Sequence, residues 1–237
     1  MRIKLEPERF RHFLEMLLMG KGKKNLGRVT PVFEKDKVSI SRFGEGATHG
    51  VYGEFYTDFF MEYEADGEPV TLTHSLLEAT RAYFKGEKKI SVFTEDNEII
   101  ISGENEEYRE ELTEEVGEPI DFDMKDTEFG FVVPAKKVTR ALVYADVLKV
   151  KADVLTLKFE DERLKIIKEQ EVSKYTKKIK PNRFEGKPVE IKILGDLFYR
   201  IIQLLEGEVW VNIYKGALIL SMKKDEYKVS YILGARG

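Results

Sequence analysis

The sequence predicts an α+β protein built from two repeats of one unit, and each repeat has the element order βαβββ followed by βαβββ. Gly-Glu-Pro-Val at residues 67–70 returns as Gly-Lys-Pro-Val at 186–189, and the second motif begins 119 residues after the first, about half of the 237-residue chain. Each motif leads into the same order of strand, helix, glycine turn and hairpin. Self-similarity at a fixed spacing is typical of a repeated architecture.

The front half of the first repeat is expected to begin with a strand at residues 3–5 and a helix opened by Pro7. The fixed φ of proline suits the first helical turn. The apolar face of this helix is formed by Phe10, Phe13, Leu14 and Leu17. Three strands should follow, at residues 29–33, 38–42 and 51–56. Because Pro31 has no backbone N–H, we expect the first of them to lie at an edge.

The back half of the first repeat has its counterpart in the second repeat, element by element. In the first repeat we expect a strand, a helix and two hairpin strands at residues 70–72, 74–84, 89–94 and 98–102. In the second repeat the same elements fall at residues 189–194, 195–205, 209–214 and 218–222. Gly86 and Gly207 provide the turn between helix and hairpin in the two copies.

The front half of the second repeat matches the first in element order only. A strand at residues 131–133 and a helix after Pro134 are expected, and the helix has an apolar face made of Val138, Ala141, Leu142 and Ala145. Strands should follow at residues 154–159, 164–168 and 174–179. The stretch 117–127, with turn residues at one end and many acids, is typical of an extended connector. We therefore predict one domain at residues 1–116, a connector at 117–128 and a second domain at 129–237.

Composition excludes several classes of protein. The chain has no Cys, so disulfides, thiolate nucleophiles and cysteine metal sites are absent. The apolar runs are too short to span a membrane, and the first residues have no signal-peptide character, so a cytoplasmic protein is expected. The charged fraction of 35% consists mostly of Lys and Glu and is typical of hyperthermophiles. The net charge of −4, as an average, argues against nucleic acid as a ligand.

No motif for catalysis is present. The sequence contains neither a glycine-rich phosphate loop nor a His-Glu-x-x-His pair, and His12, His49 and His74 are scattered. Carboxylate pairs such as Asp121 and Asp123 occur, but a chain with 43 acids holds such pairs by chance. We therefore predict a protein without enzymatic activity, cofactor or metal.

Basic residues gather on the polar faces of the four predicted helices and just beyond them. These cations are Arg9, Arg11, Lys21, Lys23, Arg81, Lys85, Lys136, Lys137, Arg140 and Arg200. If the four helices share one side of the protein, that side suits a phosphate backbone without reading base sequence. The alternative is that surface helices of a Lys-rich protein carry Lys and Arg without binding nucleic acid.

The chain resembles the DNA sliding clamps of the proliferating cell nuclear antigen (PCNA) type, the archaeal and eukaryotic processivity factors. The resemblance rests on the repeat, on the helix cations and on two short sequence segments. The first segment, Glu-Pro-Ile-Asp-Phe-Asp-Met at residues 118–124, is similar to the interdomain connector of clamps. The second, Tyr-Ile-Leu-Gly-Ala-Arg at residues 231–236, is similar to the last strand of the clamp fold. The resemblance covers almost the whole chain. It implies the DNA-clamp fold, with antiparallel sheets outside and helices on the inner face, and a head-to-tail ring, taken as a homotrimer, around duplex DNA.

The resemblance also implies two unlike edges that meet between subunits. Residues 104–115 hold seven Glu and one Arg, whereas residues 174–183 hold five cations and no acid. Opposite charge favours such a pairing, although each run could equally protect an exposed edge strand from association. The residues that we assign to this interface are Tyr108, Glu110, Glu111, Lys174, Lys177 and Lys178.

Clamps of this type bind short peptides of polymerases and other client proteins in an apolar pocket. By position the pocket residues here are Phe43, Ile120, Phe122, Ala217, Ile232 and Gly234. Ala217 and Ala235 stand where the family usually has Pro, and Phe43 replaces a smaller residue, so ring formation is better supported than client recognition. The implied partners are duplex DNA, further copies of the chain, a DNA polymerase and other clients, and a clamp loader, with no membrane.

Two alternatives stay open. One is a clamp-fold interaction module, monomeric or dimeric and from a mobile element, that binds or regulates replication proteins without encircling DNA. The other is a nuclease with a metal held by Asp121, Asp123 and Asp126.

Overall fold

The computed structural model of the chain describes residues 1–20, 26–43, 49–114, 120, 129–147, 154–170, 173–186, 188–214 and 216–236. These residues form two compact units. Unit 1 comprises residues 1–120 and 223–229, and unit 2 comprises residues 121–222 and 230–237. The predicted connector falls outside the described residues except for Ile120, so the predicted division of the chain stays a prediction.

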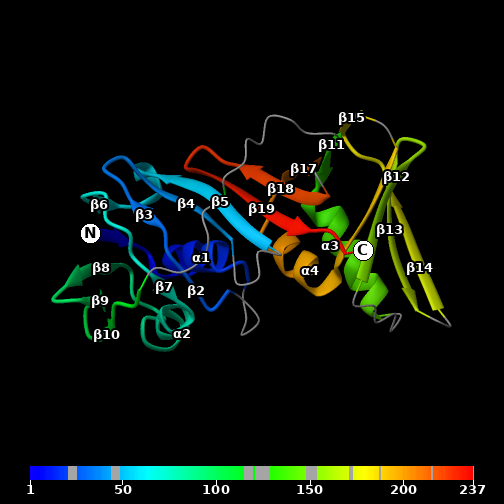
Figure 1. Cartoon of the computed structure of the whole chain (residues 1–237). Coiled ribbons are helices and arrows are strands. Elements are labelled where there is room, and N and C mark those ends of the chain that lie inside the picture. The colour runs from blue at the N-terminus through cyan, green and yellow to red at the C-terminus, as the bar shows by residue number, and fades with distance from the viewer. Residues whose placement is uncertain are drawn as a thin grey trace. The chain divides into compact units, whose positions relative to one another are not determined.

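Unit 1 contains most of the elements that the first repeat predicts (Figure 1). Its helices are α1 (Pro7–Leu17) and α2 (His74–Tyr83), with a short 3-10 helix, η1 (Thr57–Phe59). Its strands are β1 (Arg2–Leu5), β2 (Arg28–Val29), β3 (Val32–Phe33), β4 (Lys37–Phe43), β5 (His49–Tyr56), β6 (Glu62–Glu64), β7 (Leu72–Thr73), β8 (Ile90–Glu95), β9 (Glu98–Ser102) and β10 (Glu107–Glu111).

The strands of unit 1 pair antiparallel. One sheet has the order β10-β9-β8-β1-β6, which leaves β10 at an edge. β3, β4 and β5 follow one another in a second sheet, and β2 pairs with β7 in a ribbon. Phe13 of α1 packs beneath β5, because its ring centroid lies 4.9 Å from that of Phe55, which in turn stacks on Tyr227 at 5.5 Å. Burial of such large rings is a main source of core stability.

Unit 2 repeats the plan. Its helices are α3 (Ala135–Val147) and α4 (Gly195–Ile202). Its strands are β11 (Phe129–Pro134), β12 (Val154–Glu160), β13 (Arg163–Gln170), β14 (Ser173–Ile179), β15 (Arg183–Gly186), β16 (Val189–Leu194), β17 (Glu208–Tyr214) and β18 (Ala217–Lys223), with β19 (Tyr227–Gly234) shared between the two units. One sheet has the order β14-β13-β12-β16, so β14 is an edge strand, and α3 packs against α4, β11 and β14.

The structure confirms the predicted α+β class with its antiparallel sheets and differs from the sequence prediction in detail. The single strand expected at residues 29–33 is divided into β2 and β3. Pro31 cannot donate to a sheet, and the Thr30 hydroxyl instead hydrogen-bonds to the Thr71 hydroxyl at 2.9 Å. Two short edge strands, β6 and β15, were not predicted, and α4 ends at Ile202, three residues before the predicted end.

Tight turns account for two of the hairpins. Asp96 and Asn97 both have positive φ, at 47° and 65°, and join β8 to β9. Asp161 and Glu162 join β12 to β13 with φ values of 53° and 57°. Two central residues with positive φ match the right-handed twist of the flanking strands. The turns therefore fix the register of both hairpins.

Candidate nucleic-acid and subunit interfaces

The helix arginines of unit 1 are engaged by neighbouring carboxylates. The guanidinium of Arg9 lies 2.6 Å from the Glu226 carboxylate, and its central carbon lies 4.4 Å from the ring centroid of Phe59. Arg11 donates to Glu8 at 3.1 Å and lies 3.8 Å from Glu15. Two cations that the sequence analysis assigned to DNA thus take part in ion pairs within the unit.

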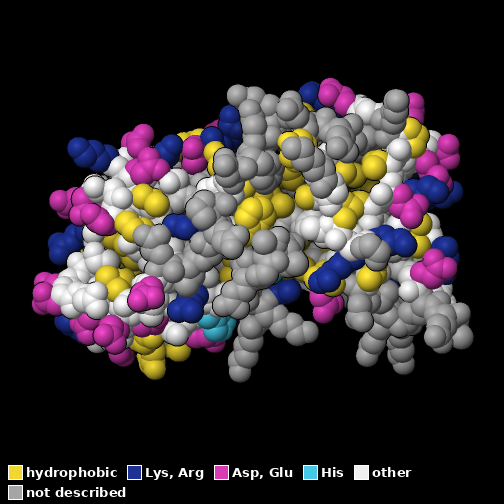
Figure 2. All heavy atoms as spheres, viewed as in Figure 1, with side chains coloured by type: hydrophobic (Ala, Val, Ile, Leu, Met, Phe, Trp, Pro, Cys, Tyr) yellow, Lys and Arg dark blue, Asp and Glu magenta, His cyan; other side chains and the backbone are white. Residues whose placement is uncertain are grey.

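Arg81 of α2 completes this network. Its two terminal nitrogens donate to Glu15 at 2.9 Å and to Glu78 at 2.8 Å. Glu15 is buried, with 5% of its surface exposed, so it needs a compensating charge. Lys85 is exposed beyond the end of α2, whereas Lys21 and Lys23 lie outside the described residues. Figure 2 shows Lys and Arg interspersed with Asp and Glu over the elements of unit 1.

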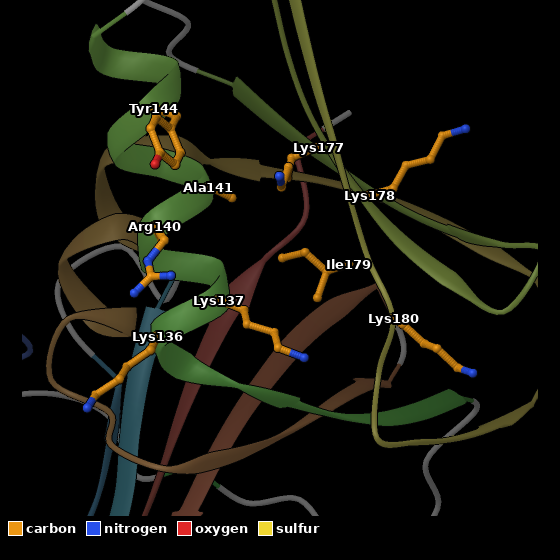
Figure 3. Close-up of a pocket in the computed structure, with 9 residues that line it drawn as sticks. All are labelled: Lys136, Lys137, Arg140, Ala141, Tyr144, Lys177, Lys178, Ile179 and Lys180. Atoms are coloured by element: carbon orange, nitrogen blue, oxygen red, sulfur yellow. The ribbon is translucent and has the colours of Figure 1, made fainter.

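The cations of α3 have a different environment. Lys136, Lys137 and Arg140 are exposed, and they line a hollow of about 360 Å³ between α3 and β14 (Figure 3). We call this site the cationic hollow, and its lining residues are Lys136, Lys137, Arg140, Ala141, Tyr144, Lys177, Lys178, Ile179 and Lys180. Six of the nine are cations and none is an acid. The structure therefore brings together cations that the sequence analysis assigned to two different interfaces.

The spacing of residues on α3 and β14 explains the lining. Lys137, Ala141 and Tyr144 are four and three residues apart, so they share one stripe of α3. On β14 the buried Ile179 and the exposed Lys177 lie on one side of the strand and the exposed Lys178 lies on the other, and Figure 3 shows Lys178 extending away from α3. The hollow thus has an apolar floor of Ala141 and Ile179 beneath the charged side chains.

Arg200 of α4 is the remaining predicted helix cation. Its Nε donates to the backbone carbonyl of Asp196 at 3.4 Å. Burial lowers the pKa of Arg200 from its ordinary value, because the charged form is less well hydrated there, although Asp196 opposes the shift. Arg200 is therefore a partly buried cation rather than a fully exposed one.

The acidic edge of unit 1 is formed by β10. Tyr108 stacks on the exposed Tyr83 of α2 with ring centroids 6.3 Å apart, and its hydroxyl donates to Glu110 at 2.9 Å. Burial, and to a smaller extent the hydrogen bond to Glu110, raise the pKa of Tyr108 to about 12. Glu110 also accepts from Thr73 at 2.6 Å. Tyr108 and Glu110 thus point to the α2 side of the strand, whereas Glu111 is exposed on the other side.

The basic edge of unit 2 is β14, and there Lys174 lies 3.0 Å from Glu169. Among the described residues Lys177 and Lys178 have no ion pair of this kind. The predicted interface residues therefore lie on two edge strands of opposite charge, one in each unit. Their pairing between copies stays a prediction.

The predicted client pocket divides between the units. In unit 1, Ile120 and Ser41 of β4 form a backbone hydrogen bond of 3.2 Å, and the nearest atoms to Gly50 include side-chain carbons of Phe43 and Ile120. In unit 2, Ile232 is buried, and Ala217 and Gly234 are partly exposed. Phe122 lies outside the described residues. Their grouping into one client pocket stays a prediction.

Sequence reasoning missed four lining residues of the cationic hollow. Ala141, Tyr144, Ile179 and Lys180 were not among the assigned site residues, although Tyr144 follows Lys137 by seven residues and so shares its helix stripe. The exposed Tyr83 beside Tyr108 was missed as well, because an aromatic residue at the end of an amphipathic helix is also typical of a core position.

Other kinds of site find no support in the described residues. They contain no group of three or more His, Asp or Glu side chains placed to hold a metal ion. Asp121, Asp123 and Asp126, which the nuclease alternative requires, lie outside them. No described helix is both long and apolar enough to cross a membrane.

Compared by sequence, the chain matches no family model and no curated protein. Compared by structure, it is similar over its whole length to PCNA clamps. A structure of A. fulgidus PCNA with the C-terminal region of FEN-1 bound has a TM-score of 0.81 at 12% identity, covering 100% of this chain and 98% of that one. The PCNA of Entamoeba histolytica has a TM-score of 0.81 at 11% identity, with the same coverage of both chains. The PCNA2–PCNA3 complex of Sulfolobus tokodaii gives 0.76 at 15% identity, covering 100% and 99%.

These likenesses show that the chain has the fold of a PCNA-type clamp. The fold that the sequence predicted is thereby confirmed. At 11–15% identity the likeness establishes the fold alone.

Proposed function

We propose that the chain is a DNA sliding clamp without enzymatic activity. Copies join head to tail into a homotrimeric ring that encircles duplex DNA and acts as a processivity factor in replication. The observation that carries the proposal is a pair of edge strands of opposite charge, β10 and β14, in a chain with the clamp fold. Unlike edges form a heterologous contact, which closes into a ring when the rotation between copies allows it.

The ring would be retained on DNA because it encircles the duplex, which is a topological link. A closed ring does not need tight contacts, so weak and mobile contacts between helix cations and phosphates are sufficient and permit sliding. A client protein held by the ring gains a high effective concentration at its substrate. The chain carries no motif for nucleotide hydrolysis, so a separate loader would open and close the ring.

Client binding is part of the proposal. The A. fulgidus clamp holds the C-terminal region of FEN-1, and the S. tokodaii structure is a complex of two clamp proteins. We extend both properties to this chain: it binds peptides of a polymerase and other clients through the predicted pocket, and it assembles through its edges. A cytoplasmic location in an archaeal hyperthermophile fits the Lys- and Glu-rich composition.

A loader-free experiment tests encirclement. A ring threads onto a linear duplex through a free end, and streptavidin on biotinylated ends then traps it there. After both ends are blocked, the protein should remain on the duplex through a high-salt wash, and cutting the duplex should release it. High salt screens phosphate contacts but does not remove a topological link.

The interaction-module alternative gives the opposite results. Protein held by charge alone leaves in high salt whether or not the ends are blocked. Light scattering after size exclusion should give a mass of three chains, and a monomer at every concentration would contradict the ring.

A further inference from the structure

The helix cations of the two units differ in how far they are neutralised. In unit 1, α1 and α2 carry Arg9, Arg11 and Arg81, and four carboxylates pair with them: Glu8, Glu15, Glu78 and Glu226. In unit 2, the sequence of α3 contains three cations and one acid, Asp146. Its neighbour β14 adds Lys177 and Lys178, together with Lys174, which is paired with Glu169. The arginines of α1 and α2 are therefore neutralised within unit 1, where the exposed Lys85 lies just beyond α2, whereas α3 and β14 of unit 2 carry a surplus of positive charge.

The arginines of unit 1 also have a structural role that competes with binding a phosphate. Arg81 bridges Glu15 of α1 and Glu78 of α2, so it ties the two helices together. To bind a phosphate, it would have to release Glu15, a buried carboxylate. Glu15 would then keep only the more distant Arg11, at 3.8 Å, and removing the closer partner of a buried charge is unfavourable. Arg9 is similarly held between Glu226 and the ring of Phe59.

Two stripes on α3 divide the cations of unit 2. Lys136 and Arg140 are four residues apart and share one stripe, whereas Lys137 belongs to the stripe of Ala141 and Tyr144. Lys136 and Arg140 both contribute to the lining of the cationic hollow, but in Figure 3 their charged ends point away from β14, whereas Lys137 extends towards the strand. Lys136 and Arg140 thus remain accessible when another chain covers the edge of β14.

We propose that, among the helix cations, Lys136 and Arg140 make the contact with the phosphodiester backbone of DNA, while Arg9, Arg11 and Arg81 brace unit 1. This assignment rests on the proposed function, because it presumes that duplex DNA is the ligand. Each subunit then contacts the duplex through the helices of one unit, not of both. Fewer phosphate contacts give a weaker dependence of affinity on salt, which suits a ring that slides.

Matched substitutions test the assignment. Arg140→Gln and Arg11→Gln make the same chemical change at two helix arginines that are both accessible to solvent. Binding of the full chain to a fluorescent duplex is measured by anisotropy over a series of low salt concentrations. Arg140→Gln, and more so its combination with Lys136→Gln, should weaken binding several-fold and reduce the slope of log K against log salt by about 0.9 for each phosphate contact removed. Arg11→Gln should leave both affinity and slope unchanged.

Three outcomes are decisive. If Arg11→Gln and Arg140→Gln lose the same amount of affinity for the duplex, the assignment is wrong, but the proposed clamp function is not contradicted. If the unmodified chain binds no duplex at any salt concentration and also fails the trapping experiment, the proposed function and the assignment fall together. Arg81→Gln is a second variant in unit 1. It should lower the melting temperature, while the folded protein keeps the same slope of log K against log salt. A reduced slope would contradict the bracing role.

Discussion

Arg81 of α2 donates a hydrogen bond of 2.9 Å to Glu15 of α1, and this contact joins the two helices of unit 1 through a buried carboxylate. Arg11 approaches the same carboxylate from one turn earlier on α1, at 3.8 Å. Charge alone marked both arginines as ligands of DNA, but Arg81 acts on the packing of α2 against α1 and Arg11 forms ion pairs within α1.

The Glu15→Gln substitution measures this contribution. It keeps the shape of the side chain but removes its charge, so we expect the free energy of unfolding to fall by about 1.5–3 kcal/mol, the range for a hydrogen bond to a charged group. Glu78→Gln is the matched control, since Glu78 pairs with the same arginine from an exposed position and should cost less than about 1 kcal/mol. Urea denaturation followed by circular dichroism gives both values. Equal losses of unfolding free energy in the two variants would show that the burial of Glu15 does not strengthen its contribution to stability.

A second prediction concerns acid. Glu54 on β5 lies between Lys37 at 3.1 Å and Lys228 at 2.8 Å. Burial raises the pKa of Glu54, but the hydrogen bonds from Lys228 and Lys37 outweigh it, so the pKa lies below its ordinary value of 4.5. A lowered pKa in the folded state stabilises the protein above the ordinary pKa, and this stability is lost as pH falls through the folded value.

Glu54→Gln should therefore destabilise the protein at neutral pH and have a much smaller effect at an acid pH below the folded pKa of Glu54, where the unmodified side chain also loses its charge. Urea unfolding at both pH values checks this. Glu62→Gln is the control: its carboxylate is two-thirds exposed beside Lys4 and should change stability little at either pH. A Glu54→Gln deficit that stays constant down to acid pH would contradict the role of the charge.

Much of the fold was predictable because the repeat places equivalent elements at equivalent positions. The hairpin strand at residues 98–102 was predicted with its observed bounds, since turn residues on one side and alternating or apolar residues define it. The two-residue strands β2 and β3 were predicted as a single strand, because the residues on both sides of Pro31 are typical of one continuous strand. The short β6 and β15 depend on pairing with strands distant in the chain, which local sequence does not encode.

The candidate site was predictable in its residue types but not in its grouping. Charge marked Arg81 and Arg140 alike, and only the structure distinguishes them, because the partner of Arg81 is 66 residues away in the sequence. Likewise, Lys137 and Lys177 were assigned to different interfaces and line one hollow. Long-range contacts decide whether a surface cation is paired, and a single sequence does not show them.

A third prediction uses two glycines in strands. A Cβ at Gly53 of β5 would lie 2.9 Å from the backbone oxygen of Lys228, which cannot move without disturbing the strand. A Cβ at Gly130 of β11 would lie 2.7 Å from the side-chain oxygen of Asn212, and that side chain can rotate. Gly53→Ala should thus cost about 1–3 kcal/mol of unfolding free energy, as overpacking does, and Gly130→Ala less. Thermal melts of both variants compare them, and the reverse order would refute the argument.

The last prediction concerns the two charged edges. On β10 the residues that point away from α2 include Glu107 and Glu111, and on β14 those that point away from α3 include Lys174 and Lys178. If copies join by pairing β10 with β14, the two outward-facing sets come together. Lys174→Glu with Lys178→Glu places like charges at the contact and should shift the protein to monomers, and so should Glu107→Lys with Glu111→Lys.

The chain that carries all four reversals restores opposite charge at the contact and should assemble again. Light scattering after size exclusion reports the mass of each variant, and low salt should enlarge the differences because screening is weaker there. Asp58→Lys with Asp66→Lys, two exposed acids of unit 1 outside β10, controls for a simple change in net charge and should leave assembly intact. Failure of the fourfold variant to assemble, while it remains folded, would show that these edges are not the surfaces through which copies meet.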